Sequence, residues 1–268
     1  MNKGLILFFI SIWSHAALGQ ARPDSLFESG GNLFEQNNLA AAANCYKEIV
    51  LNHKSYKYYD QSLYNLAYTY NTMDSADLAI FWYEKVRDSN ASDSARVGGR
   101  GILEPYANYK HYSTFNIGNL EYNRGNYEKA MEYYKQCQTR YPYYNESGTD
   151  LRINKNRVII FITDCLAKLE RYDEALSTIL PEALDSYGSS NYMSVVNRTI
   201  KLIDEHFDKK QVNKELDEAL KTLKPKENER YYTFVWKNKS YNLYPYSLDM
   251  SLFLEEIKQS DFWKQLSN

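Results

Sequence analysis

The chain has 268 residues, of which 15% are aromatic and 25% charged, and its formal net charge at pH 7 is −2. Proteins that bind nucleic acid need a basic face, so this charge balance argues against DNA or RNA as a partner. Three cysteines are too few, and odd in number, for a disulfide framework.

The N-terminus has the pattern of a secretory signal peptide. Lys3 precedes the apolar run GLILFFISIW, and SHAALGQ then supplies small residues for cleavage near Gly19. The apolar run is too short for a stable membrane span, and residue 20 is Gln rather than a lipid-accepting Cys. We expect residues 1–19 to be removed and the mature chain, without a transmembrane span, to be periplasmic or secreted in a Gram-negative envelope. An uncleaved N-terminal anchor is the alternative.

Four helical hairpins follow, and they share one internal spacing. In each hairpin a small residue of the first helix precedes an alanine of the second helix by 12 residues, and a packing residue comes four residues later. The sets are Gly30, Ala42 and Tyr46; Ala67, Ala79 and Tyr83; Gly118, Ala130 and Tyr134; and Thr163, Ala175 and Ile179. A small residue lets two helix backbones approach closely. The repeated interval therefore predicts hairpins that all pack in the same way.

The third hairpin, HYSTFNIGNLEYNRGNYEKAMEYYKQCQTRYPYY at 111–144, is the most regular. Gly125 suits a turn where φ is positive, and Pro142 ends the second helix because it lacks an N–H. This segment resembles a tetratricopeptide repeat, a helix–turn–helix unit of about 34 residues that stacks with its neighbours. The residues that carry the resemblance are Gly118, Gly125, Tyr127, Ala130, Tyr134 and Pro142.

The resemblance implies an all-α fold, a right-handed α-solenoid built of tetratricopeptide helix hairpins. Four units, at about 23–56, 60–93, 111–144 and 156–187, would fill most of residues 20–185. An insertion near 89–110 separates the second unit from the third. We expect a loop over 89–101 and then a short extra helix over 102–109. A second polar loop, YYNESGTD, precedes the fourth unit.

After Leu184 the pattern changes. Residues 186–226 read as a degenerate helical pair, with apolar residues three and four apart. Residues 227–268 read as a small C-terminal β-hairpin, which turns near Lys237–Ser240, plus a helix with a second start signal at Ser260. An open solenoid needs its last apolar face covered, so we interpret this hairpin and helix as a cap.

The resemblance also places a concave groove along the first helices of the units. The groove positions are Tyr64, Asn65, Tyr68, Asn71, Tyr112, Phe115, Asn116, Asn119, Tyr122 and Asn123, and the fourth unit adds Arg157, Phe161, Asp164 and Lys168. A tyrosine ring offers rigid contact area, and a carboxamide can both donate to and accept from a peptide bond. The alternative is that these tyrosines pack between helices.

These features favour an exported, non-catalytic scaffold that binds a protein or peptide in its groove. Two alternatives stay open. One is a glycan-associated nutrient-binding envelope component, since such proteins expose aromatic rings and amides to sugars. The other is an outer-membrane assembly factor of similar length and repeat number, although the acceptor Cys is missing. Neither the oligomeric state nor the choice between groove and C-terminal hairpin as binding site follows from the sequence.

Signals for catalysis are weak. His53, His111 and His206 are far apart and lack metal-binding spacing, and no nucleophile-elbow motif is present. We therefore expect no enzyme activity, cofactor or metal. Cys137 and Cys165 lie on adjacent units, where they would either pair or serve as separate core residues.

Overall fold

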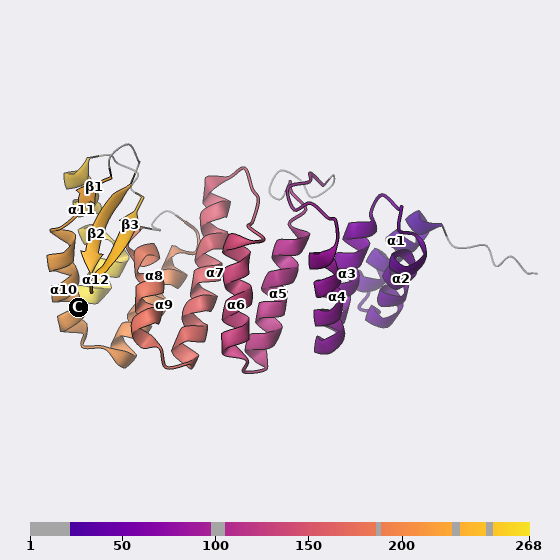
Figure 1. Cartoon of the computed structure of the whole chain (residues 1–268), viewed down its shortest axis with the longest axis horizontal. Helices are drawn as coiled ribbons and strands as arrows, with labels where there is room; N and C mark the ends of the chain where they lie inside the picture. The colour runs from indigo at the N-terminus through magenta and orange to yellow at the C-terminus, as the bar shows by residue number, and fades with distance from the viewer. Residues whose placement is uncertain (1–21, 98–104, 186–188, 227–230, 245–248) are drawn as a thin grey trace, which may run out of the picture.

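The computed structural model describes residues 22–97, 105–185, 189–226, 231–244 and 249–268. The predicted signal peptide with its cleavage near Gly19 lies outside the described residues, as does the glycine-rich part of the insertion. The described residues form twelve helices and three strands, which follow one another in an elongated row with the strands at the C-terminal end (Figure 1).

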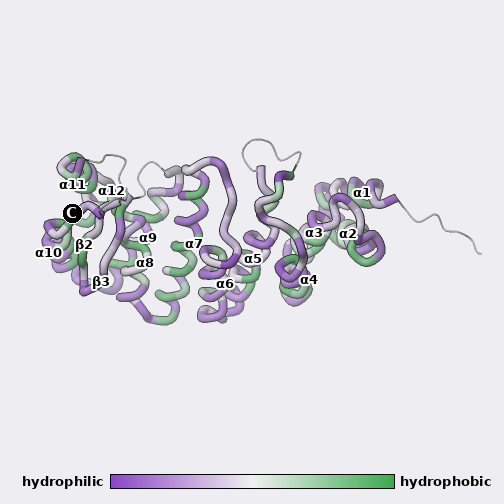
Figure 2. The backbone as a smooth tube through the Cα atoms, turned by 45° about the horizontal axis from the view of Figure 1, so that its top comes forward, coloured by the Kyte–Doolittle hydropathy of each residue, from purple (hydrophilic) through white to green (hydrophobic). Residues whose placement is uncertain are grey.

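Five consecutive helix hairpins make up most of the row. They are α1 (Pro23–Glu35) with α2 (Leu39–Asn52), α3 (Tyr59–Thr72) with α4 (Ala76–Asp88), α5 (Tyr109–Asn123) with α6 (Tyr127–Thr139), α7 (Gly148–Lys168) with α8 (Tyr172–Asp185), and α9 (Tyr192–His206) with α10 (Lys209–Leu220). Each helix packs against the next, and apolar and polar residues alternate along each one (Figure 2).

The first helices of the hairpins lie on the inner side of the row. In the described part of the chain α3 packs directly against α5, and α7 against α9, whereas no two second helices make comparable contact. Stacked hairpins whose first helices are closer together than their second helices curve towards the first helices. The concave face is therefore formed by α1, α3, α5, α7 and α9.

Glycines stand where helices cross most closely. A Cβ atom added to Gly118 would lie 2.7 Å from Cε1 of Tyr134, and one added to Gly30 would lie 2.9 Å from Cε1 of Tyr46. Ala130 is completely buried at the same crossing as Gly118. The predicted roles of this spacing are thus confirmed for the first and third hairpins.

The turns of the first four hairpins share one backbone feature. Asn37, Asp74, Gly125 and Glu170 all have positive φ, and each stands five residues before the alanine of the second helix. The next N–H then closes the first helix, as when Asn126 N donates to Glu121 O at 3.0 Å. The prediction for Gly125 is confirmed. The fifth hairpin differs, because the Asp208 side chain caps α10 by accepting from Lys210 N and Gln211 N.

The insertion between α4 and α5 is not helical where it is described. Ala107 N donates to Ala95 O at 2.9 Å, and Val97 N donates to Pro105 O at 3.0 Å, so two segments run antiparallel. The prediction of an extra helix over 102–109 is wrong for 105–108. Pro105 has no N–H to give a helix, and the backbone of Ala107 is already paired across the insertion.

The insertion also supports the start of α5. The carboxylate of Asp93 accepts from Lys110 N at 2.7 Å and from His111 N at 2.8 Å. Asn108 exchanges hydrogen bonds of 2.9 and 2.8 Å with the backbone of Tyr144, in the loop before α7. That loop is shorter than expected, because Ser147 caps α7 and the helix begins at Gly148.

The C-terminal cap contains one more strand than predicted. Strands β1 (Lys224–Pro225), β2 (Tyr232–Trp236) and β3 (Lys239–Leu243) form an antiparallel sheet in that order, and α11 (Met250–Gln259) and α12 (Asp261–Ser267) follow. Tyr232, Phe234 and Trp236 are all buried on one face of β2. Lys237 and Asn238 have positive φ, the geometry that a two-residue hairpin turn requires. Ser260 accepts from Trp263 N and starts α12.

Two further predictions concern the cysteines and the membrane. Cys137 and Cys165 are free thiols, and burial raises the pKa of each to about 12. Within the described ranges, no helix combines the length and the apolar character needed to cross a bilayer.

Candidate functional site

An aromatic strip crosses the concave face from α1 to the loop before α7. It consists of Phe34, Tyr68, Tyr64, Tyr112 and Tyr143, whose neighbouring ring centroids are 5.7, 6.2, 6.5 and 6.1 Å apart. The rings of Tyr64 and Tyr68 are nearly parallel, at 14°. Tyr68 is 43% exposed, so the strip presents aromatic surface to solvent rather than being closed into the core.

Two of the predicted groove asparagines on α5 form hydrogen bonds with buried tyrosines. Asn116 Nδ2 donates to Tyr83 Oη at 3.0 Å, and Asn119 Oδ1 accepts from Tyr134 Oη at 2.8 Å. Both tyrosines are completely buried, and this burial raises the pKa of each phenol. A buried hydroxyl without a partner is costly, so these amides stabilise the helix packing.

The predicted groove asparagines of α3 also form hydrogen bonds with buried tyrosines. The Asn65 side chain hydrogen-bonds the hydroxyl of Tyr46, and that of Asn71 hydrogen-bonds Tyr83. Asn123, at the end of α5, is exposed instead. Four of the five predicted groove amides thus have a structural role within the solenoid, and their carboxamides are oriented by it.

Phe115 belongs to the core. It is buried between α5, α6 and α7, with its ring centroid 5.4 Å from Tyr134 and 5.2 Å from Phe161. Phe161 is half-buried in the same cluster, whereas Arg157 on α7 is exposed.

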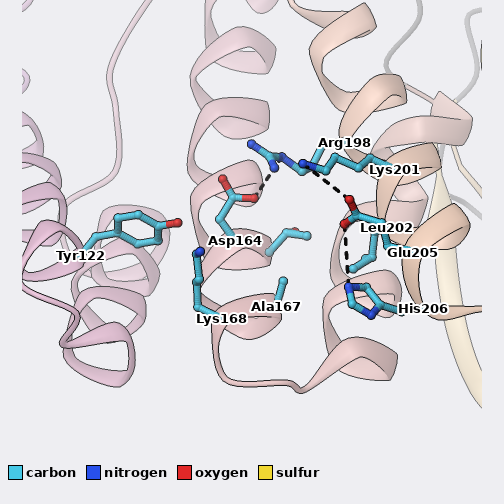
Figure 3. A pocket seen from close by; sticks show the side chains of 10 residues that line it. Tyr122, Asp164, Ala167, Lys168, Arg198, Lys201, Leu202, Glu205 and His206 are labelled. Carbon is cyan, nitrogen blue, oxygen red and sulfur yellow. Dashed lines mark ion pairs between the residues drawn. The ribbon is translucent and has the colours of Figure 1, made fainter.

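A cavity of about 350 Å³ opens on the concave face between α7 and α9. It is lined by Tyr122 from α5, by Thr163, Asp164, Ala167 and Lys168 from α7, and by Arg198, Lys201, Leu202, Glu205 and His206 from α9. Figure 3 shows Tyr122 on one side, the α9 side chains on the other, and Asp164 and Lys168 between them. We call this cavity the charged pocket. It brings together three predicted groove positions: Tyr122, Asp164 and Lys168.

Ion pairs organise the charged pocket. Arg198 Nε lies 3.0 Å from Asp164 Oδ1, and the Asp164 side chain is only 15% exposed. Burial raises the pKa of Asp164 in spite of the neighbouring Arg198. Glu205 lies 3.7 Å from Lys201 and 3.8 Å from His206. Arg198 and Lys201 are therefore each held beside a carboxylate.

Two other side chains complete the charged pocket. The His206 ring stacks on Tyr172, with centroids 3.7 Å apart and an angle of 12°, which fixes its orientation. Lys168 is exposed, and no carboxylate of the described residues lies within 4 Å of its amine. Burial raises the pKa of Tyr122, so its hydroxyl stays protonated at neutral pH.

His111 is buried and hydrogen-bonded within the fold, so it has a structural role. Its Nδ1 is 2.8 Å from Tyr141 O, its Nε2 is 3.1 Å from Asn154 Nδ2, and burial lowers its pKa to about 4. The ring is therefore neutral near pH 7. A search of the described residues finds no cluster of three or more His, Cys, Asp and Glu side chains placed to hold a metal ion.

Sequence reasoning missed the α9 side of the charged pocket. Thr199 on α9 lies 36 residues after Thr163 on α7, and both are buried with their hydroxyls bonded one turn back. The same step of 36 residues carries the predicted groove positions of the fourth unit to Met193, Asn197, Ile200 and Asp204. The spacing therefore indicates a fifth unit but does not single out Arg198 and Lys201. Phe34 and Tyr143 had no comparable signal.

Comparison with solved structures finds one protein, RapI, with a similar overall fold. The apo form of RapI aligns with 91% of this chain at 14% identity and a TM-score of 0.51; this chain spans 61% of that structure. PilF of Pseudomonas aeruginosa aligns with 66% of this chain and 67% of its own at 19% identity and a TM-score of 0.43. YrrB, described as a TPR protein with an unusual peptide-binding site, aligns with 69% of this chain and 88% of its own at 14% identity and a TM-score of 0.42.

The family comparison is more specific. No curated protein matches the chain. Residues 60–92 and 113–144 match the family model described as tetratricopeptide repeat. These segments hold nearly all of α3 with α4 and most of α5 with α6, and they include Tyr64, Tyr68 and Tyr143 of the aromatic strip. The second and third helix hairpins of this chain are therefore tetratricopeptide repeats.

Proposed function

We propose that this chain is an exported, non-catalytic scaffold that binds an extended protein segment along its concave face. The observation that carries the proposal is the aromatic strip, which spans three hairpins and leaves Tyr68 substantially exposed. Tyrosine rings in a row give large contact area at little cost in side-chain entropy, which suits recognition of a peptide chain.

The amides beside the strip add polar contacts in this proposal. Because Asn119 accepts from Tyr134 through Oδ1, its NH₂ group is oriented as a donor. Asn116 donates to Tyr83 through Nδ2, which orients its oxygen as an acceptor. A peptide backbone offers one acceptor and one donor at each residue, so a fixed acceptor and a fixed donor on one helix suit it.

The proposed export rests on the N-terminal sequence. Lys3, the apolar run after it and the small residues before Gln20 together fit a cleaved signal peptide. Mass spectrometry of the protein from its own cells, after separation of cytoplasm, periplasm and medium, tests this. A mature form that begins at Gln20 outside the cytoplasm supports export. An intact N-terminus in the cytoplasm contradicts it.

Affinity capture tests the binding role. The bait is the mature protein, and the groove variant carries Tyr68→Ala and Tyr122→Ala. The matched control carries Leu78→Ala and Phe81→Ala, two exposed apolar residues of the second helix α4. We expect captured partners to be lost with the groove variant and kept with the control. Circular dichroism confirms that both are folded. A partner kept by the groove variant would move the site to the convex face or the cap, and binding of glycans alone would favour the nutrient-binding alternative.

A further inference from the structure

The charged pocket has an unbalanced positive charge in a chain that is negative overall. Lys168, Lys201 and Arg198 contribute three positive charges, and Asp164 and Glu205 contribute two negative ones. One positive charge is left over, although the chain carries −2 at pH 7. A cation in a partly enclosed cavity is attracted to an anion more strongly than one on an open surface.

Part of the pocket is arranged before any ligand enters. Arg198 Nε lies 3.0 Å from the largely buried Asp164 carboxylate, which holds the guanidinium in place, whereas Lys201 makes only an exposed ion pair of 3.7 Å with Glu205. Lys168 stands between Tyr122 and these pairs, and the Tyr122 hydroxyl faces the same space (Figure 3). Preorganised donors bind more tightly than mobile ones because less entropy is lost.

We propose that the charged pocket binds one carboxylate, the side chain of an Asp or Glu in the segment that occupies the concave face. This inference deepens the proposed function and rests on it. A carboxylate carries one negative charge and so balances the single excess charge of the pocket. A phosphate dianion would leave the pocket negative. Lys168 and the Tyr122 hydroxyl supply the donors, while Ala167 and Leu202 line the space for the methylene groups.

The direct test is a titration with a small probe and does not need the partner. The probe is N-acetyl-glutamate methylamide, and its neutral match is N-acetyl-glutamine methylamide. Amide NMR shifts of the ¹⁵N-labelled protein report the site. We expect the acidic probe to shift the amide signals of the last turns of α7 and α9 and to bind at least tenfold more tightly than the neutral probe. Its binding should weaken as NaCl is added.

Two variants of opposite sign sharpen the test. Lys168→Gln with Lys201→Gln should weaken the acidic probe at least tenfold. The control Lys47→Gln with Lys210→Gln changes the net charge equally at exposed positions of α2 and α10 and should have little effect. Glu205→Gln raises the pocket charge by one and should tighten binding by about threefold.

Several outcomes would overturn the inference. They are equal shifts from the two probes, equal weakening by the control pair, and inorganic phosphate binding more tightly than the acidic probe. The result is separable from the groove proposal. If capture of partners fails while the acidic probe binds, the groove proposal fails alone; if partners are captured but the probe does not bind, only the carboxylate assignment fails.

Discussion

The two parts of the concave face differ in their chemistry. From α1 to α5 the exposed surface is aromatic, and the polar groups beside it are neutral amides that bond to buried tyrosines. Between α7 and α9 the surface is a cavity of charged side chains held by ion pairs. Contact with the first part should depend on shape and be insensitive to salt, whereas contact with the second should weaken as salt screens it. If the proposed function holds, one bound segment would meet two independent determinants on this face.

The largest expected effect is a difference in stability between variants of a buried tyrosine and of an exposed tyrosine in the aromatic part. Tyr83 is completely buried, so Tyr83→Ala should lower the free energy of unfolding by about 3 to 5 kcal/mol. Tyr68 is 43% exposed, and Tyr68→Ala should cost less than about 1 kcal/mol. Urea denaturation followed by circular dichroism measures both. Similar losses would mean that the strip is a core and not a binding surface.

A second pair of variants tests the close crossing under the strip. Gly118→Ala places a Cβ 2.7 Å from the Tyr134 ring and should cost about 1 to 3 kcal/mol through overpacking. Gly31→Ala meets only an atom 3.9 Å away and should stabilise α1 by about 0.5 to 1 kcal/mol. Thermal unfolding of both proteins gives the comparison. A gain at both positions would contradict the crossing geometry.

The stability of the protein should depend on pH through one buried carboxyl group at the end of α8. Asp185, at the end of α8, is buried and accepts from Tyr244 N at 2.8 Å; burial raises its pKa to about 6, against 3.8 for the ordinary side chain. In the folded state it therefore holds a proton that the unfolded chain releases. Its contribution to stability falls as pH rises from about 4 to about 6. The Asp185→Asn variant has no carboxyl group at this position, so it lacks this pH-dependent contribution to stability.

The free energy of unfolding of Asp185→Asn, relative to the unmodified protein, should therefore rise by about 1 to 2 kcal/mol between pH 4 and pH 7. Urea denaturation at both pH values measures it. Asp88→Asn, at an exposed position at the end of α4, is the control, and its relative stability should not change in this way. A pH-independent difference for Asp185→Asn would show that its carboxyl is solvated.

The smallest expected effect concerns the pocket lysines. Lys168→Gln with Lys201→Gln should change the free energy of unfolding by less than about 0.5 kcal/mol, because both amines are exposed and Lys201 forms only a surface ion pair. The same double variant is expected to lose the acidic probe. A large loss of stability in thermal unfolding would instead assign the two lysines to folding.

The helix hairpins were predictable because small residues at crossings have few substitutes. Gly118, Ala130 and Tyr134 show the spacing directly, and Gly125 identifies its turn. Glu170 has positive φ at the matching turn without any local signal for it. There the stacking of the helices decides the conformation.

The contacts between hairpins were harder to predict. The repeat pattern places Asn116 at a groove position. Its hydrogen-bond partner Tyr83 lies 33 residues earlier, on another hairpin, and the pattern does not indicate this contact. The extra helix expected over 102–109 is absent from 105–108, where Pro105 O accepts from Val97 N and Ala107 N donates to Ala95 O. Arg198 was overlooked because its hairpin turns at Asp208 and lacks the left-handed residue of the others. The first two misses depend on contacts with other segments that local patterns do not encode.

The hydrogen bonds of the insertion have a mechanical consequence. Lys110 Nζ reaches Ser89 O at 2.6 Å, Asp93 holds the first amides of α5, and Asn108 is bonded to Tyr144. These bonds join the second, third and fourth hairpins along one edge. Each repeat of a solenoid contacts only its neighbours, so the contacts at each joint between hairpins set how easily that joint opens under tension. This edge should resist opening at the α4–α5 joint, so that stretching begins at joints without such a brace and the curvature around the aromatic strip is kept.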